Sequence, residues 1–226
     1  MKTIAALQPG YLPWVGFFDL MKRSDLFVIE DNLKYTKQDW RNRNRIRTAS
    51  GARYLTVPVR LPAEHLPINQ VMIDNSTDWS RRHWNVLYEN YHAAPYWSRY
   101  AALLSETYKR TWERLIDLDL HLIDFLRSEF QITTPIVLLS SLPVAFGKDK
   151  TQSLIDLVKA VGGHALLEGA SGRRFIDEAR FVQAGLDIRF QDYVCKPYRQ
   201  QFQPFLSHLS AIDLLLNEGP AGTEFI

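Results

Sequence analysis

The first thirty residues alternate between short apolar runs and one amphipathic segment, and this pattern constrains the fold more than any other feature of the sequence. Residues 3–7 form an apolar run that stops at Pro9-Gly10, which predicts a buried strand and a turn. Residues 14–23 carry apolar side chains at helical spacing, and the DLFVI segment at 25–29 predicts a second strand. A strand, turn, helix and strand within about thirty residues predict a βαβ unit with parallel strands.

The second half of the chain repeats this alternation. We expect strands at 136–142, 164–167 and 186–190, with helices at 151–161 and 173–184 between them. Residues 78–130 are helical in pattern with a break at Pro95. Short strands are also expected at 71–73 and at 53–60, where Pro58 indicates a sheet edge. The chain is therefore expected to form one α/β domain over residues 1–226, with a Rossmann-like parallel sheet and a helical insertion at about 78–130.

The composition is that of an ordinary folded chain, with 46% hydrophobic and 23% charged residues among 226. It excludes a disordered tail, a collagen-like fibre and a disulfide-rich mini-protein. Lys and Arg number 27 and Asp and Glu number 25, so the formal charge of +2 gives no reason to expect DNA as a partner.

The sequence indicates a reducing compartment and no membrane span. Cys195 is the single cysteine, so no disulfide forms within the chain. The apolar-rich stretch at 115–130 is interrupted by charged residues, and the apolar run at the N-terminus is too short for a signal segment. We expect a cytoplasmic protein. The six histidines match no zinc pattern and no G-x-S-x-G motif occurs, so neither a metal site nor a serine triad is expected.

The first candidate site is the turn between the first strand and its helix. In open parallel sheets ligands bind outside the carboxyl ends of the strands, which is where this turn lies. The turn contributes Gln8, Tyr11, Trp14 and Gly16 as candidate binding residues, and a helix N-terminus can bind an anion. The alternative is a proline-rigidified turn with buried rings.

The second candidate site is the basic segment 34–60. It holds eight of the 27 Lys and Arg residues and one acid, Asp39, which gives a local charge of +7. If residues 40–47 are extended, four guanidiniums share one face, and Trp40, Asn42, Asn44 and Ile46 share the other. Lys37, Arg41 and Arg43 are candidates for binding phosphate or carboxylate. The segment could equally be a solvated face, or could meet RNA phosphates, with Trp40 and Tyr35 available for stacking.

Two further candidate sites also join a strand to a helix. In the first, Lys148 and Lys150 flank a helix start with Thr151 as a plausible N-cap, which suggests phosphate binding or an ordinary capped helix. In the second, Gly169 and Gly172 follow Glu168 and allow close approach of a ligand. Because such junctions share one edge of a parallel sheet, they predict a single binding crevice.

Several segments together resemble the WbqC-like protein family. They are QPGYLPWVGFF at 8–18, WRNR at 40–43, LEGASGRRFI at 167–176 and FLSHLSAIDLLLNEGP at 205–220. The resemblance implies a component of surface-polysaccharide (O-antigen) biosynthesis and a glycine transferase that acylates an amino sugar. The first βαβ unit is also distantly similar to HIGH-type nucleotidylyltransferases: residues 14–17 keep the glycine of that motif and lack both histidines, and 148–151 resemble the lysine-bearing phosphate loop.

These observations lead to three functional hypotheses. The first is an acyl or aminoacyl transferase acting on a nucleotide-linked amino sugar, with Asp31 or Glu168 as base. Asn42, Arg43 and Lys150 would stabilise charge, and Tyr11, Trp14 and Trp40 would stack on a base or sugar. The second is an ATP-using ligase or nucleotidylyltransferase that needs ATP and Mg²⁺. The third is a module without catalysis that binds a nucleotide or an aminoacyl-tRNA through the basic segment.

Overall fold

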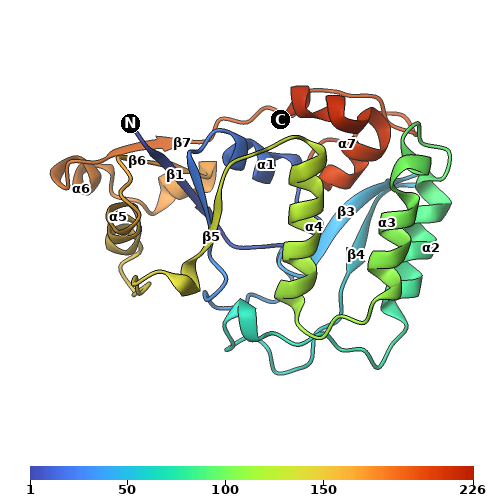
Figure 1. Ribbon diagram of the computed structural model, residues 1–226, viewed down its shortest axis with the longest axis horizontal. Helices are drawn as coiled ribbons and strands as arrows, with labels where there is room; N and C mark the ends of the chain where they lie inside the picture. The colour runs from blue at the N-terminus through green and yellow to red at the C-terminus, as the bar shows by residue number, and fades with distance from the viewer.

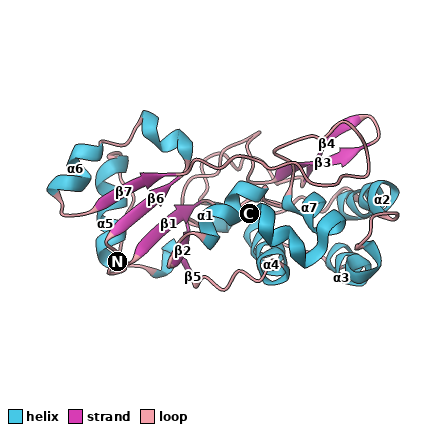
Figure 2. Ribbon diagram, turned by 90° about the horizontal axis from the view of Figure 1, so that it is seen from above, coloured by secondary structure: helices cyan, strands magenta, loops and turns pink.

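A five-stranded parallel sheet forms one end of the molecule in this computed structural model, which describes residues 1–226 (Figures 1 and 2). The strands lie in the order β5-β2-β1-β6-β7, and every pair is parallel. The order places β1 in the centre and grows outward on both sides, as in doubly wound folds. The expected Rossmann-like α/β architecture is confirmed. The strands are β1 (Thr3–Leu7), β2 (Leu26–Ile29), β5 (Ile136–Leu138), β6 (Ala165–Glu168) and β7 (Asp187–Phe190).

Helices cover the two faces of the sheet differently. Alternate strand residues point to opposite faces, so Ile4 and Ala6 belong to one buried cluster and Ala5 to the other. The first face packs against α5 (Lys150–Ala160) and α6 (Glu178–Gln183). The second face packs against α1 (Val15–Lys22) and continues into the core of the helical part.

The mid-chain segment consists of three helices, with the break at Pro95 where it was expected. They are α2 (Trp79–Tyr91), α3 (Trp97–Lys109) and α4 (Leu115–Glu129). The first two lie at the opposite end of the elongated molecule from α5 and α6, next to an antiparallel hairpin of β3 (Arg43–Thr48) and β4 (Gly51–Thr56) (Figure 1). No helix combines the length and apolarity needed to cross a bilayer.

The short C-terminal helix α7 (Ala211–Glu218), which the sequence analysis did not predict, joins these parts through a buried carboxylate. Asp213 is inaccessible to solvent and accepts hydrogen bonds from the hydroxyls of Tyr91 and Tyr198, each at 2.6 Å, and from Gln200 at 2.9 Å. The Tyr91 hydroxyl also accepts the backbone N–H of Arg47 at 2.9 Å, which ties β3 to α2 and α7.

Several predicted elements were wrong in extent or place. Residues 53–60 do not form an edge of the main sheet: β4 ends at Thr56 and pairs locally with β3, because the turn at Gly51, with φ of +118°, folds the chain back. Residues 71–73 make only isolated bridges. The strand expected at 136–142 ends at Leu138 and continues as a 3-10 turn. The helix expected at 173–184 is split, and its α-helical part begins after Asp177, whose side chain accepts the N–H of Ala179.

The expected alternation along 40–47 is correct only in part. Asn42, Asn44 and Ile46 are buried, as predicted for one face. Arg47 is also buried, because its guanidinium donates to the carbonyl oxygens of Thr48, Phe202 and Pro204, while Trp40 lies outside the strand and is 44% exposed.

Candidate functional site

Two neighbouring cavities lie at the carboxyl edge of the sheet, where β1, β2 and β6 end. The first, which we call the polar cavity, measures about 580 Å³ and is lined by Glu30, Lys150 and Glu168 among others. The second, the aromatic cavity, measures about 770 Å³ and is lined by Trp14, Trp40, Tyr193 and His208 among others. Leu7, Gln8 and Arg41 line both. The strand ends therefore meet at one edge, as the sequence indicated, and a cavity stands on either side of Gln8.

Three polar side chains at the ends of adjacent strands point to the same face of the sheet. Leu7 pairs with Ile29, so Gln8 lies beside Glu30; Ala5 pairs with Leu167, so Ala6 lies beside Glu168. Because residues two apart share a face, Gln8, Glu30 and Glu168 all lie on the side covered by α5. Lys150 enters the polar cavity from the first turn of that helix.

The two glutamates of the polar cavity have pKa values near neutrality. Burial raises the pKa of Glu30 to about 7, although the positive charges of Arg41 and Lys150 oppose the shift. Burial raises the pKa of Glu168 to about 8, and the negative charge of Glu30 adds to this, against the Gly169 N–H and Lys150. Carboxyl groups in this range both accept and donate protons at neutral pH, which ordinary exposed glutamates do not.

Arg41 lies between the two cavities with hydrogen-bonding capacity to spare. Its guanidinium pairs with Asp39 at 3.4 Å, and its Nε–H is buried without a partner. Burial lowers the pKa of Arg41, while Asp39 and Glu30 favour its charged form. The side-chain oxygens of Gln8 and Asn32, which line the polar cavity, are likewise buried and unpartnered. Such groups are costly in an empty protein and suit a polar ligand.

Planar side chains line the aromatic cavity. The ring of Trp14 stacks on His208, with centroids 5.5 Å apart and planes 16° apart, and meets Tyr193 edge-on at 5.6 Å. His208 has a φ of +57°, a conformation that non-glycine residues seldom adopt outside functional or tightly constrained positions.

Two glycines of the first turn serve packing at this cavity. A Cβ at Gly16 would lie 2.1 Å from the Trp14 indole, so Gly16 makes room for that ring. A Cβ at Gly10 would lie 2.6 Å from the carbonyl oxygen of Trp40, so Gly10 lets the segment carrying Arg41 approach the turn. The Gly16 position, predicted to bind substrate or phosphate, is thus occupied by an aromatic side chain.

Other predicted site residues lie outside both cavities. Tyr11 is fully buried, and its hydroxyl bonds His83 at 2.9 Å and Tyr108 at 2.5 Å. The Asp31 carboxylate accepts from Ser140 N–H (2.9 Å), Ser140 hydroxyl (2.6 Å) and Asn69 (3.1 Å), so it holds loops together. Three more predicted residues have partners of their own. Asn42 donates to the Val57 carbonyl oxygen at 2.7 Å, Arg43 donates to the Gln38 carbonyl oxygen, and Lys37 pairs with Glu64 at 3.4 Å.

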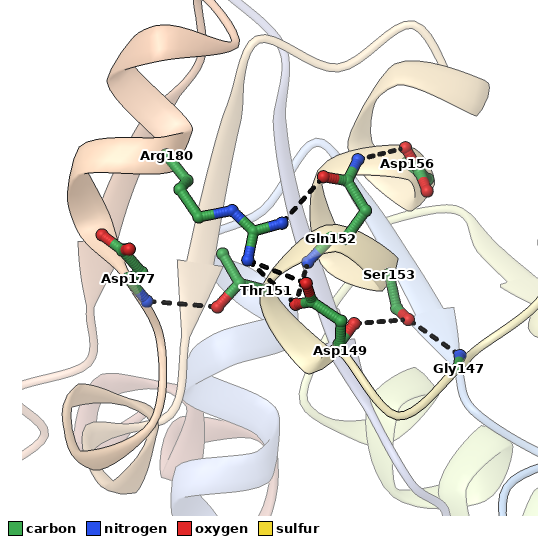
Figure 3. A network of polar contacts seen from close by, with 8 residues as sticks. All are labelled: Gly147, Asp149, Thr151, Gln152, Ser153, Asp156, Asp177 and Arg180. Atoms are coloured by element: carbon green, nitrogen blue, oxygen red, sulfur yellow. Dashed lines mark hydrogen bonds and ion pairs between the residues drawn. The ribbon is translucent and has the colours of Figure 1, made fainter.

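The start of α5 is closed by its own carboxylate (Figure 3). Asp149, not Thr151, is the N-cap: it accepts the N–H of Gln152 at 3.0 Å and pairs with Arg180 through both oxygens. Asp149 caps the helix instead of Thr151 because it stands directly before the first helical residue, Lys150, where its side chain reaches the N–H of Gln152. Thr151 already lies inside the helix. Thr151 is buried and its hydroxyl accepts the N–H of Asp177 at 3.2 Å, while Lys148 is exposed and lines neither cavity. A carboxylate at this helix start opposes binding of an anion there.

Sequence reasoning missed several residues of the two cavities. Glu30 follows β2 directly, and counting strand alternation from Val28 would have selected it over Asp31. Asn32, Tyr193 and His208 lie in loops with no periodic signal, so only the folded chain brings them to the site. Gly169 lines the aromatic cavity, and Gly172 lies against Glu168.

The fold defines an α/β protein with a doubly wound sheet and two cavities at the strand ends, where such sheets bind ligands. Residues 8–225 match the WbqC-like protein family, and the chain belongs to that family. It is 34% identical over 229 residues to the uncharacterized protein Rv1507c of Mycobacterium tuberculosis, with 100% of this chain and 98% of the relative covered. No solved structure matches the chain significantly. No three His, Cys, Asp or Glu side chains gather as metal ligands.

Proposed function

We propose that this protein is an acyl or aminoacyl transferase that acylates the amino group of a nucleotide-linked amino sugar, in the biosynthesis of a surface polysaccharide. The observation that carries the proposal is the pair of Glu30 and Glu168, with pKa values near neutrality, beside Lys150 in the polar cavity. This cavity shares Leu7, Gln8 and Arg41 with the aromatic cavity. Membership of the WbqC-like family supports the same setting.

The chemistry requires a proton acceptor at the amine. The neutral amine attacks the carbonyl carbon of an activated acyl donor, a thioester or an oxygen ester. A C–N bond forms, the bond from the carbonyl carbon to sulfur or oxygen breaks, and the leaving group keeps the electron pair. The amine proton passes to the Glu168 carboxylate, which then protonates the leaving group. A carboxyl group with a pKa of about 8 does both more readily than one at the usual glutamate value.

Cationic side chains complete the site. The Lys150 ammonium lies 4.6 Å from the Phe175 ring centre, and the Nε–H of the Arg41 guanidinium has no partner. Both positive charges favour the ionised form of Glu30. They would stabilise negative charge on the acyl oxygen and bind the diphosphate of the acceptor. Because Arg41 lines both cavities, a diphosphate bound there would place the sugar amine toward Glu168 in the polar cavity.

The test combines binding and transfer assays. UDP- and TDP-linked amino sugars serve as acceptors. The donors are acetyl and glycyl thioesters, a glycyl oxygen ester on the terminal ribose of an RNA, or glycine with ATP and Mg²⁺, and mass spectrometry detects the amide. Glu168→Gln should lower the transfer rate at least about a hundredfold, the usual scale of general base catalysis, and leave acceptor affinity within about twofold. Glu89→Gln, on the exposed side of α2, is the matched control. If no donor acylates any acceptor, the proposal is wrong; activity only with ATP would instead favour the ligase hypothesis.

A further inference from the structure

A continuous row of planar side chains leads from the exposed hairpin into the aromatic cavity. The Arg43 guanidinium lies 4.8 Å above the ring of Tyr54, and this ring lies 6.3 Å from that of Trp40. The Arg45 guanidinium lies 5.8 Å from the Trp40 ring centre and donates to the carbonyl oxygen of His208 at 3.1 Å. We call these four side chains, Arg43, Tyr54, Trp40 and Arg45, the hairpin tract.

The hairpin tract reaches solvent at one end and the cavity at the other. Tyr54 is 47% exposed and Trp40 is 44% exposed, so both rings are accessible to a ligand. A further cavity of about 350 Å³ is lined by Trp14, Trp40, Arg45 and His208, so the tract opens directly beside the stacked Trp14–His208 pair.

The length and chemistry of the tract favour a ligand with several stacked rings. A single nucleobase can cover one or two planar groups, and the tract offers two rings and two guanidiniums before the Trp14–His208 pair begins. Rings interleaved with arginine are typical of surfaces that bind unpaired bases and their phosphates. The Nε–H of Arg45 is buried without a partner, so this guanidinium still has a hydrogen bond to give.

We propose that the hairpin tract binds the single-stranded 3′ end of an RNA, which brings the acyl donor to the cavity as an ester on its terminal ribose. This inference rests on the proposed transferase function. In the transfer step the sugar amine forms a C–N bond to the ester carbon, the C–O bond to the ribose breaks, and the ribose oxygen receives the proton that Glu168 removed from the amine.

The test uses fluorescence anisotropy with the full-length protein and a labelled single-stranded RNA of about eight nucleotides, close to the site sizes of known single-strand binders. Tyr54→Ala should weaken binding about tenfold, the loss expected for one stacked base. Tyr54→Phe, which keeps the ring, should bind like the unmodified protein. Tyr88→Ala on α2 removes a ring of similar exposure, 50%, and should leave affinity unchanged.

The contribution of the arginines in the hairpin tract is tested with one variant and one control variant. Arg43→Gln should weaken binding and reduce the slope of affinity against salt by about one. Arg53 is exposed on the neighbouring strand and faces away from Arg43 and Arg45. Arg53→Gln should therefore change the affinity and the salt slope less than Arg43→Gln does. Binding that is equally strong for double-stranded RNA, or equally weakened by Tyr54→Ala and Tyr88→Ala, would overturn the inference.

The two proposals fail in different ways. If the protein transfers an acyl group from a thioester and binds no RNA, the RNA-bound donor is wrong and the transferase function is supported. If the protein binds RNA through Tyr54 and Arg43 but acylates no amine, the transferase function is wrong and the hairpin tract is an RNA-binding surface.

Discussion

Gly172 lies directly against the side chain of Glu168: a Cβ at residue 172 would stand only 2.3 Å from Cγ of Glu168 and 3.1 Å from Cδ1 of Ile176. The loop after β6 therefore folds back over the glutamate that lines the polar cavity, and the absence of a side chain at Gly172 sets where that carboxyl group lies. This contact gives Gly172 a role in positioning the Glu168 side chain.

Gly172→Ala should displace Glu168 and lower the rate of the proposed transfer at least about tenfold, since small shifts of the proposed base are costly. Overpacking should also lower the free energy of unfolding by about 1–3 kcal/mol. Gly169→Ala adds the same methyl group where nothing lies within 4 Å, so its thermal unfolding should match that of the unmodified protein. Equal unfolding of the two variants would contradict the steric argument.

The two glutamates predict how stability depends on pH. Their pKa values in the folded protein, about 7 for Glu30 and about 8 for Glu168, lie above the ordinary value of 4.5, mainly because of burial. The folded protein therefore holds protons that the unfolded chain has released. The free energy of unfolding should fall as the pH rises from 4.5 to about 8.

Urea unfolding across this pH range measures the effect. A variant carrying both Glu30→Gln and Glu168→Gln should show a flatter profile, because amides do not titrate. Glu89→Gln, at an exposed position, should keep the original slope. A slope that is unchanged in the double variant would show that other groups cause the pH dependence.

The Tyr11 hydroxyl predicts a measurable loss of stability. This hydroxyl forms hydrogen bonds with His83 and Tyr108, and both partners are buried. Burial lowers the pKa of His83 to about 4, so the imidazole is neutral at pH 7. Tyr11→Phe leaves both partners unsatisfied and should lower the free energy of unfolding by about 1–3 kcal/mol. Tyr88→Phe, at a half-exposed position, should change it by less than about 0.5 kcal/mol.

Replacing Asp119 with an apolar residue is expected to raise the stability of the protein. Asp119 is fully buried in α4, neither of its carboxylate oxygens has a partner, and burial raises its pKa well above the usual range. Asp119→Leu should raise the free energy of unfolding by about 1–3 kcal/mol, because a buried unsatisfied polar group is removed. Asp119→Asn should change little, since a protonated acid and an amide are similar in size. Marked destabilisation by Asp119→Asn in urea unfolding would show that the carboxyl group is ionised.

The order of strands and helices could be read from the sequence because local patterns carry it. The apolar run at 3–7 coincides with β1, and the break at Pro95 separates α2 from α3. Asn42, Asn44 and Ile46 also fall on one buried face, as two-residue alternation requires. Two cavities lie at the sheet edge where the sequence predicted a binding crevice, because parallel strands end on the same side of their sheet.

Only the tertiary structure decided which side chains meet there. Glu30 lies beside Gln8 and across from Glu168 because β1 stands between β2 and β6, an order that no local pattern reveals. Arg47 is buried rather than solvated because carbonyl oxygens more than 150 positions away accept its hydrogen bonds. His208 reaches Trp14 through a loop without periodicity. Local sequence determined the strands of the parallel sheet and the helical insertion. Long-range packing, which balances burial against hydrogen bonding, selected the residues that line the cavities.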